Sequence, residues 1–65
     1  MKINANKFIT AMAKAKLSVG ELSEKSGIGK NTIYSINRGN YKATPKTVGL
    51  LASALGVDVE ELIEN

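Results

Sequence analysis

The chain has 65 residues, a formal net charge of +3 at pH 7, and neither cysteine nor histidine. A chain of this length forms one domain, and without those two residue types it has no disulfide, no thiol nucleophile, no histidine base and no plausible zinc site. The composition therefore argues against an enzyme, and it implies no metal and no cofactor.

Charge is divided unevenly along the chain. Residues 1–46 contain all nine basic side chains and only two of the six acidic ones, whereas residues 47–65 contain the other four acidic residues. Such a cationic surface favours a polyanionic partner, although lysines that only solubilise a helical bundle would give the same composition. The apolar runs are too short for a membrane span and the first residues do not resemble a signal peptide, so a cytoplasmic protein is expected.

One pattern recurs five times along the chain and predicts five short helices. In each instance an apolar residue precedes an N-cap residue, and a second apolar residue follows at the fourth helical position, which is the arrangement of a hydrophobic staple. The predicted helices cover residues 5–16, 19–26, 30–38, 45–55 and 59–64.

Local signals mark the first two helix starts. Asn4 is the N-cap of the helix over residues 5–16, whose apolar residues recur every three or four positions and predict one buried face. The helix over residues 19–26 begins with Ser18 and Glu21 at the spacing of a capping box.

The second and third predicted helices are separated by only three residues, Gly27-Ile28-Gly29. Two helices of about eight residues joined by a glycine-containing turn match a helix-turn-helix unit, here over about residues 18–38. Gly27 can adopt the positive φ that such a turn requires, and Ile28 is expected to fill the angle between the helices.

The C-terminal third carries two further helix starts. Pro45 follows the cap Thr44 at the first position of the fourth helix, and Asp58 and Glu61 have capping-box spacing at the start of the fifth. The sequence therefore predicts an all-α domain of five helices over residues 1–65.

Residues 17–39, LSVGELSEKSGIGKNTIYSINRG, resemble the helix-turn-helix of the lambda repressor and Cro family of bacterial and phage regulators. TPKTV at 44–48 and ALGV at 54–57 are also similar to that family, so the resemblance covers nearly the whole chain. It implies a compact five-helix lambda-repressor-like domain that binds a specific sequence of double-stranded DNA and regulates transcription. The form expected is a repressor that binds a palindromic operator as a dimer.

Helical geometry predicts which residues read the DNA. With about 3.6 residues per turn, a helix over 30–38 that buries Ile33 and Ile36 turns its opposite face outward. The N-terminal part of a recognition helix reaches deepest into the major groove, and the resemblance implies the same positions. Base contacts are therefore expected from Lys30, Asn31, Tyr34 and Ser35.

The chemistry of three of these side chains suggests particular bases. Lys30 suits the acceptors of guanine, Asn31 suits adenine, and the ring of Tyr34 suits a thymine methyl group. For Tyr34, an ordinary surface aromatic or a phosphate-binding hydroxyl is an equally open alternative.

Contacts to the DNA backbone are predicted at the start of the second helix and around the third. Family members often have Gln in place of Val19 and Glu in place of Gly20, so a side-chain phosphate contact is missing here. The backbone N–H groups remain, and a helix N-terminus binds phosphate without a side chain. A solvated loop would account for Asn40 and Lys42 equally well. The predicted set is Ser18, Val19, Gly20, Thr32, Arg38, Asn40 and Lys42.

Val59 and Ile63 lie four residues apart on a face that a five-helix body need not cover, and a terminal apolar face often serves dimerisation in the family. A weak homodimer is therefore expected, with no small-molecule ligand. The chain is then either a minimal Cro-like regulator or the headpiece of a longer protein. The alternative function is a protein-interaction module, such as an antitoxin or adaptor, that uses the same fold.

Overall fold

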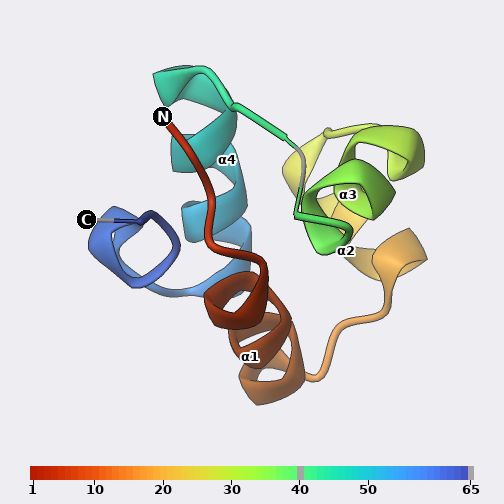
Figure 1. The fold of residues 1–65 in the computed structure, drawn as a ribbon. Helices are drawn as coiled ribbons and strands as arrows, with labels where there is room; N and C mark the ends of the chain where they lie inside the picture. Colours follow the sequence, from red (N-terminus) through yellow and green to blue (C-terminus); the bar gives the residue numbers. More distant parts are fainter. Residues whose placement is uncertain (40, 65) are drawn as a thin grey trace.

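The computed structural model describes residues 1–39 and 41–64. It contains the α-helices α1 (Ala5–Ala15), α2 (Val19–Ser26), α3 (Lys30–Asn37) and α4 (Pro45–Leu55), followed by the 3-10 helix η1 (Val59–Glu61). The described residues form no strand and only two isolated bridges. The all-α prediction is confirmed, but the expected five α-helices are four α-helices and one 3-10 turn (Figure 1).

The capping residues begin the helices as predicted. The N–H of Lys7 donates to Asn4 Oδ1 at 2.9 Å, and the N–H of Thr47 donates to Thr44 Oγ1 at 3.3 Å. Such bonds satisfy N–H groups that the first helical turn leaves without partners. At the start of η1, the N–H of Asp58 donates to Glu61 Oε2 at 2.9 Å.

Two helix ends differ from the predicted boundaries by one residue. α1 ends at Ala15 because Lys16 adopts a left-handed conformation with φ 57°. α3 ends at Asn37, and Arg38 is its C-cap residue. Both changes leave the predicted side chains on the same helix faces.

The fifth predicted helix is short because the end of the chain bonds to its beginning. The N–H of Asn4 donates to the carbonyl of Leu62 at 2.8 Å, and the N–H of Glu64 donates to the carbonyl of Lys2 at 3.0 Å. Ile63 forms an antiparallel bridge with Ile3. The N–H groups of Leu62 and Ile63 still donate to the carbonyl of Val59, at 2.9 and 3.3 Å, whereas the N–H of Glu64 bonds to Lys2 instead of continuing the helix.

The same docking covers part of the predicted dimer surface. Val59 and Ile63 are half-buried and pack against the hydrophobic core, so this face is less exposed than the sequence suggested, and its role in dimerisation stays a prediction. Ile63 contacts the N-terminal segment of its own chain.

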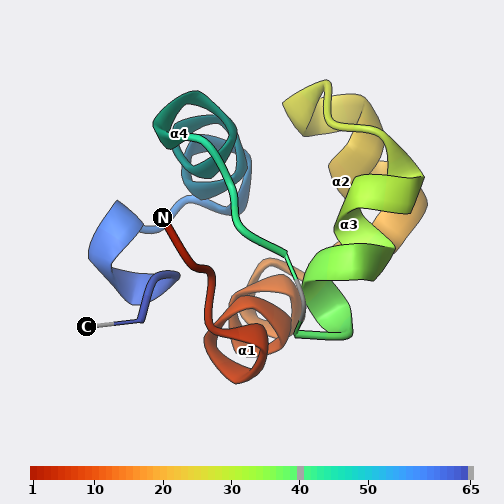
Figure 2. The same cartoon turned by 45° about the horizontal axis from the view of Figure 1, so that its top comes forward.

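Every helical element and both terminal segments contribute to a single core. Phe8, Leu22 and Val48 are completely buried, as are Ile33, Leu51 and Leu62. α2 packs against α4 and α1 packs against α3, so the helix-turn-helix pair rests on two different helices (Figure 2). None of the helices in the described ranges is long and apolar enough to cross a membrane.

Candidate nucleic-acid interface

The turn between α2 and α3 is built as predicted and has one additional support. Gly27 ends α2 with φ 77°, and Ile28 packs partly buried against the core. Ser26, which the sequence analysis did not single out, is buried, and its hydroxyl donates to the carbonyl of Leu22 at 2.7 Å. The same oxygen accepts the N–H of Ile28 at 3.1 Å. The two hydrogen bonds of the Ser26 hydroxyl therefore join the turn to α2 and help set the direction of α3.

α3 turns its inner face to the core and its outer face to solvent. Ile33 and Ile36 are buried, and both lie on the inner face. Of the α3 residues predicted to contact bases or phosphate, Thr32 and Ser35 are half-buried, and the exposed ones are Lys30, Asn31, Tyr34 and Arg38.

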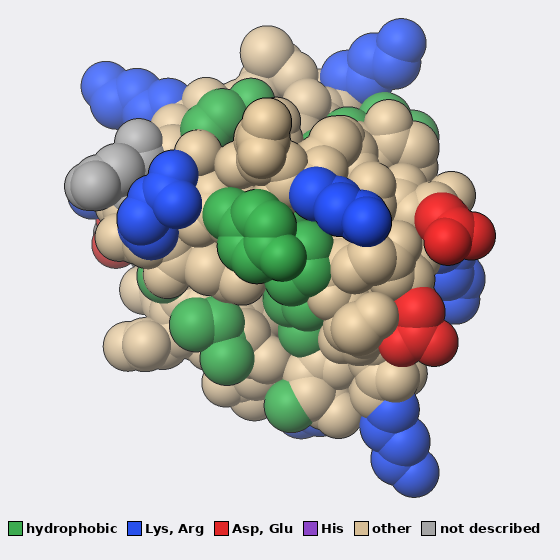
Figure 3. Space-filling model, turned by 90° about the vertical axis from the view of Figure 1, so that its right-hand side faces the viewer, with side chains coloured by type: hydrophobic (Ala, Val, Ile, Leu, Met, Phe, Trp, Pro, Cys, Tyr) green, Lys and Arg blue, Asp and Glu red, His purple; other side chains and the backbone are tan. Residues whose placement is uncertain are grey.

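The face formed by α2 and α3 is cationic around an apolar centre. Figure 3 shows Lys and Arg side chains on both sides of a central hydrophobic patch, with acidic side chains confined to the margins. On α3, Tyr34 is the one large hydrophobic residue with substantial exposure among the described residues, at 48%. This arrangement suits a ligand with a charged backbone and apolar groups at its centre.

Arg38 and Ser35 act as a pair on this face. Arg38 Nη2 donates to Ser35 Oγ at 3.2 Å, across one turn of α3. The bond orients the guanidinium along the helix surface while leaving its other N–H groups available.

The start of α2 approaches the start of α3. A Cβ at Gly20 would lie 3.7 Å from Lys30 Cε and 3.9 Å from Lys30 Nζ, so the lysine side chain lies across the first turn of α2. Val19 packs its side chain against the core, so its backbone N–H is the group that the phosphate prediction depends on at this position. Lys30, a predicted base contact, therefore lies beside the predicted phosphate contacts at the start of α2.

The predicted capping box at the start of α2 is complete. The N–H of Glu21 donates to Ser18 Oγ at 3.1 Å, and the N–H of Ser18 donates to Glu21 Oε1 at 2.9 Å. The bond from the Ser18 backbone, with a smaller contribution from its side chain, holds the pKa of the Glu21 carboxyl below its ordinary value. Because Ser18 Oγ already accepts a bond within the helix, its hydroxyl hydrogen is what remains for a phosphate.

The capping box predicts a pH dependence of the α2 start. Since the pKa of Glu21 is lower in the folded than in the unfolded chain, the box stabilises the fold at neutral pH and this contribution is lost as the pH falls through the folded pKa. The variant Ser18→Ala removes the smaller, side-chain contribution and keeps the backbone N–H, so the pKa of Glu21 should rise only part of the way toward its ordinary value. A carboxyl titration by NMR of parent and variant measures this, and identical pKa values in the two proteins would contradict it.

Replacement by alanine should change the stability of the fold in opposite directions at two glycines. Gly20 has ordinary helical φ, and a Cβ there meets Lys30 only at van der Waals distance, so Gly20→Ala should stabilise the fold by about 0.5–1 kcal/mol. Gly27 has φ 77° with open space around it, so Gly27→Ala should cost about 1–2 kcal/mol through its backbone alone. Urea denaturation of both variants measures the difference, and destabilisation by Gly20→Ala would mean that Lys30 is displaced.

The loop after α3 is described in part. Lys42 is exposed and its backbone bridges to Lys2, which places its side chain at the surface as the phosphate prediction requires. Asn40, another predicted backbone contact, lies outside the described residues. Among the described residues, no three acidic, histidine or cysteine side chains gather in a way that could hold a metal ion.

Comparison with known proteins agrees with this geometry. The helix-turn-helix family model matches residues 10–62, which is most of the chain and includes α2, the turn and α3. The chain belongs to the lambda repressor/Cro-like helix-turn-helix family. The family match supports a DNA-binding regulator, so the resemblance inferred from residues 17–39 is confirmed.

A solved structure adds a second comparison. The structure of Streptomyces albus HEPD with its substrate 2-hydroxyethylphosphonate and Fe(II) bound is similar to this chain, with a TM-score of 0.80 and 30% sequence identity. The match covers 88% of this chain but only 13% of that chain, so a fold like this one forms a small part of a longer protein there. No curated protein matches the chain.

Proposed function

We propose that this helix-turn-helix domain inserts α3 into the major groove of a specific double-stranded DNA sequence and represses transcription by occupying a palindromic operator as a dimer. One observation carries the proposal: the face of α3 opposite Ile33 and Ile36 presents polar and cationic side chains together with one exposed aromatic ring. Hydrogen-bonding groups and an apolar group on one helix face are what base edges in the major groove require.

The proposal divides the contacts between specificity and affinity. Asn31 and Tyr34 read base edges near the start of α3, and Lys30 lies between the bases and the start of α2. The N–H groups of Val19 and Gly20 bind a phosphate, as do Arg38 at the end of α3 and Lys42 in the loop after it. The chain acts in the cytoplasm without a cofactor, and it is not an enzyme.

Selection of bound sites from random duplexes tests the function directly. The expected result is a short consensus present as two inverted half-sites whose centres are about 34 Å apart, one helical turn of DNA. Recovery of no consensus, with binding equal on all duplexes, would contradict sequence-specific recognition.

Arg38 and Lys42 are expected to contribute affinity without specificity. Replacing either with glutamine should weaken binding to selected and random duplexes alike, and should reduce the slope of log K against log salt by about one unit per phosphate contact. Titrations of a half-site duplex at several salt concentrations measure the slope. Lys14→Gln, which removes a charge from α1 on a different side of the molecule, is the matched control and should change the slope less.

A protein-interaction module is the second candidate, and the HEPD match favours it, since a similar fold there makes up 13% of a much longer chain. Such a module would bind its partner chain through surface contacts and would be indifferent to DNA. A steep loss of DNA affinity with rising salt therefore favours the first function, and its absence favours the second.

A further inference from the structure

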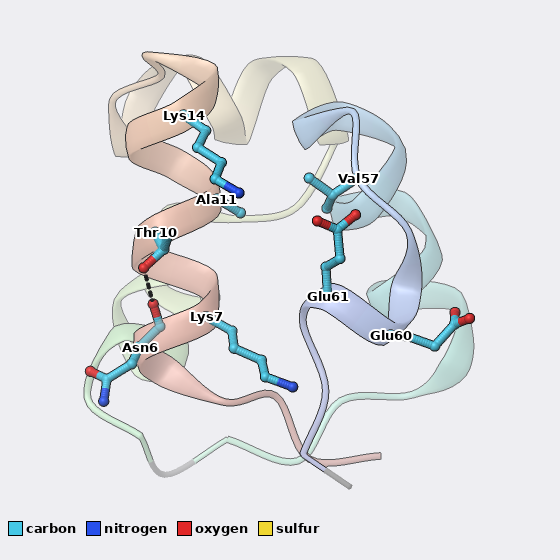
Figure 4. Close-up of a pocket in the computed structure, with 8 residues that line it drawn as sticks. All are labelled: Asn6, Lys7, Thr10, Ala11, Lys14, Val57, Glu60 and Glu61. Atoms are coloured by element: carbon cyan, nitrogen blue, oxygen red, sulfur yellow. Dashed lines mark hydrogen bonds between the residues drawn. The ribbon is translucent and has the colours of Figure 1, made fainter.

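A groove of about 460 Å³ runs between α1 and η1, outside the face formed by α2 and α3. Lys7 and Lys14 line its α1 side, Glu60 and Glu61 line its η1 side, and Ala11 and Val57 supply apolar surface between them (Figure 4). The two walls therefore carry opposite charges.

On each wall of the groove, one charged side chain makes a hydrogen bond within the chain. Lys7 Nζ donates to the carbonyl of Ile63 at 3.1 Å, and Glu61 accepts the N–H of Asp58. Lys14 and Glu60 are exposed, and neither pairs with a charged group in residues 1–39 and 41–64, where the single ion pair joins Lys2 to Glu64. Figure 4 shows Lys14 pointing toward the space between α1 and η1, and Glu60 at its outer margin.

We propose that a second copy of this chain binds along this groove, with Lys14 of each copy facing Glu60 of the other. A two-fold axis directed along the groove exchanges its walls, so the lysine wall of one copy meets the glutamate wall of its partner, and the same contact occurs twice. Isologous dimers require this kind of self-complementary surface. Val57, half-buried at the floor of the groove, is covered further in the same contact.

Pairing along this groove leaves the outer face of α3 free, because no residue of α3 lines the groove. The domain measures 26 × 21 × 19 Å, and the groove lies on a different side from the outer face of α3. The glutamates at the contact also keep this surface away from phosphate. The proposal rests on the function proposed above, since it names the surface that pairs two copies on an operator.

Charge reversal tests the surface, with self-association followed by sedimentation equilibrium and DNA binding by gel shift. Lys14→Glu alone and Glu60→Lys alone each place like charges together at two points, so each variant should self-associate at least about tenfold more weakly than the parent. An equimolar mixture of the two variants restores opposite charges at both points. In the mixture, the two variants should therefore associate with each other, and bind the full palindrome, with the parental affinity.

Two controls distinguish an effect on this dimer surface from an effect on the fold or on DNA binding. Lys46→Glu reverses an exposed lysine outside the groove and should leave self-association unchanged. Both groove variants should keep the parental helix content by circular dichroism and the parental affinity for an isolated half-site. Failure of the parent itself to bind a half-site would instead count against the proposed function.

Two results would overturn the groove as the dimer surface. One is parental self-association by both single variants. The other is loss of association that the mixture does not restore, which would indicate that the groove is occupied by a different protein or by a further segment of a longer chain.

Discussion

Replacement of Asn31 with alanine is expected to weaken binding to the selected operator by about 1–3 kcal/mol and to relax the choice of base at one position per half-site. Asn31 is exposed in the first turn of α3, and no hydrogen bond within the described residues uses its amide. Both the donor and the acceptor of that amide are therefore available for adenine. Binding to random duplexes should hardly change, because phosphate contacts supply most of that affinity.

The control for this variant is another asparagine in a first helical turn. Asn6→Ala removes the same amide from α1, where Asn6 lines the groove and lies away from α3. The variant Asn6→Ala should bind a half-site duplex with the parental affinity. If Asn31→Ala lost equal affinity for selected and random duplexes, Asn31 would be a backbone contact and the base-reading role would be wrong.

Replacement of Leu62 with alanine is expected to cost about 2–5 kcal/mol of unfolding free energy. Leu62 is completely buried, and its carbonyl accepts the N–H of Asn4, so its side chain and backbone both join the ends of the chain to the core. A single core of this size rarely supplies more than about 3–5 kcal/mol in total. The variant should therefore be largely unfolded in thermal and urea denaturation, and it should lose DNA binding in proportion.

Leu50→Ala is the matched control, since it removes the same atoms from a leucine on α4 that is 39% exposed. It should cost well under half as much as Leu62→Ala. Equal stability of the two variants would mean that the segment after η1 is not part of the core. The half-buried, core-packed position of Ile63 would then also be in question.

Much of this fold could be predicted from sequence because its signals are local. The N-cap bonds of Asn4, Ser18 and Thr44 each join residues three positions apart, and the apolar period of a helix repeats within one or two turns. The turn at Gly27 likewise depends on one backbone angle. Such features do not depend on how the helices pack.

The outward face of α3 could also be predicted, for the same reason. Once Ile33 and Ile36 are known to be buried, the geometry of a helix places Asn31 and Tyr34 on the opposite side. The role of each side chain on DNA is a separate matter, and for these residues it stays a prediction.

What only the tertiary structure decided depends on contacts between residues far apart in sequence. Residues 62–64 have a helical pattern, yet the carbonyl of Leu62 and the N–H of Glu64 bond to Asn4 and Lys2, more than fifty positions away. This competition converts the predicted fifth helix to a 3-10 turn and half-buries Ile63. The approach of Lys30 to Gly20 and the opposed charges of the groove arise in the same way, since they exist only after packing has brought separate helices together. The sequence by itself therefore determined the helices and the direction in which α3 faces, whereas packing determined which terminal residues are buried and which surface remains for a partner.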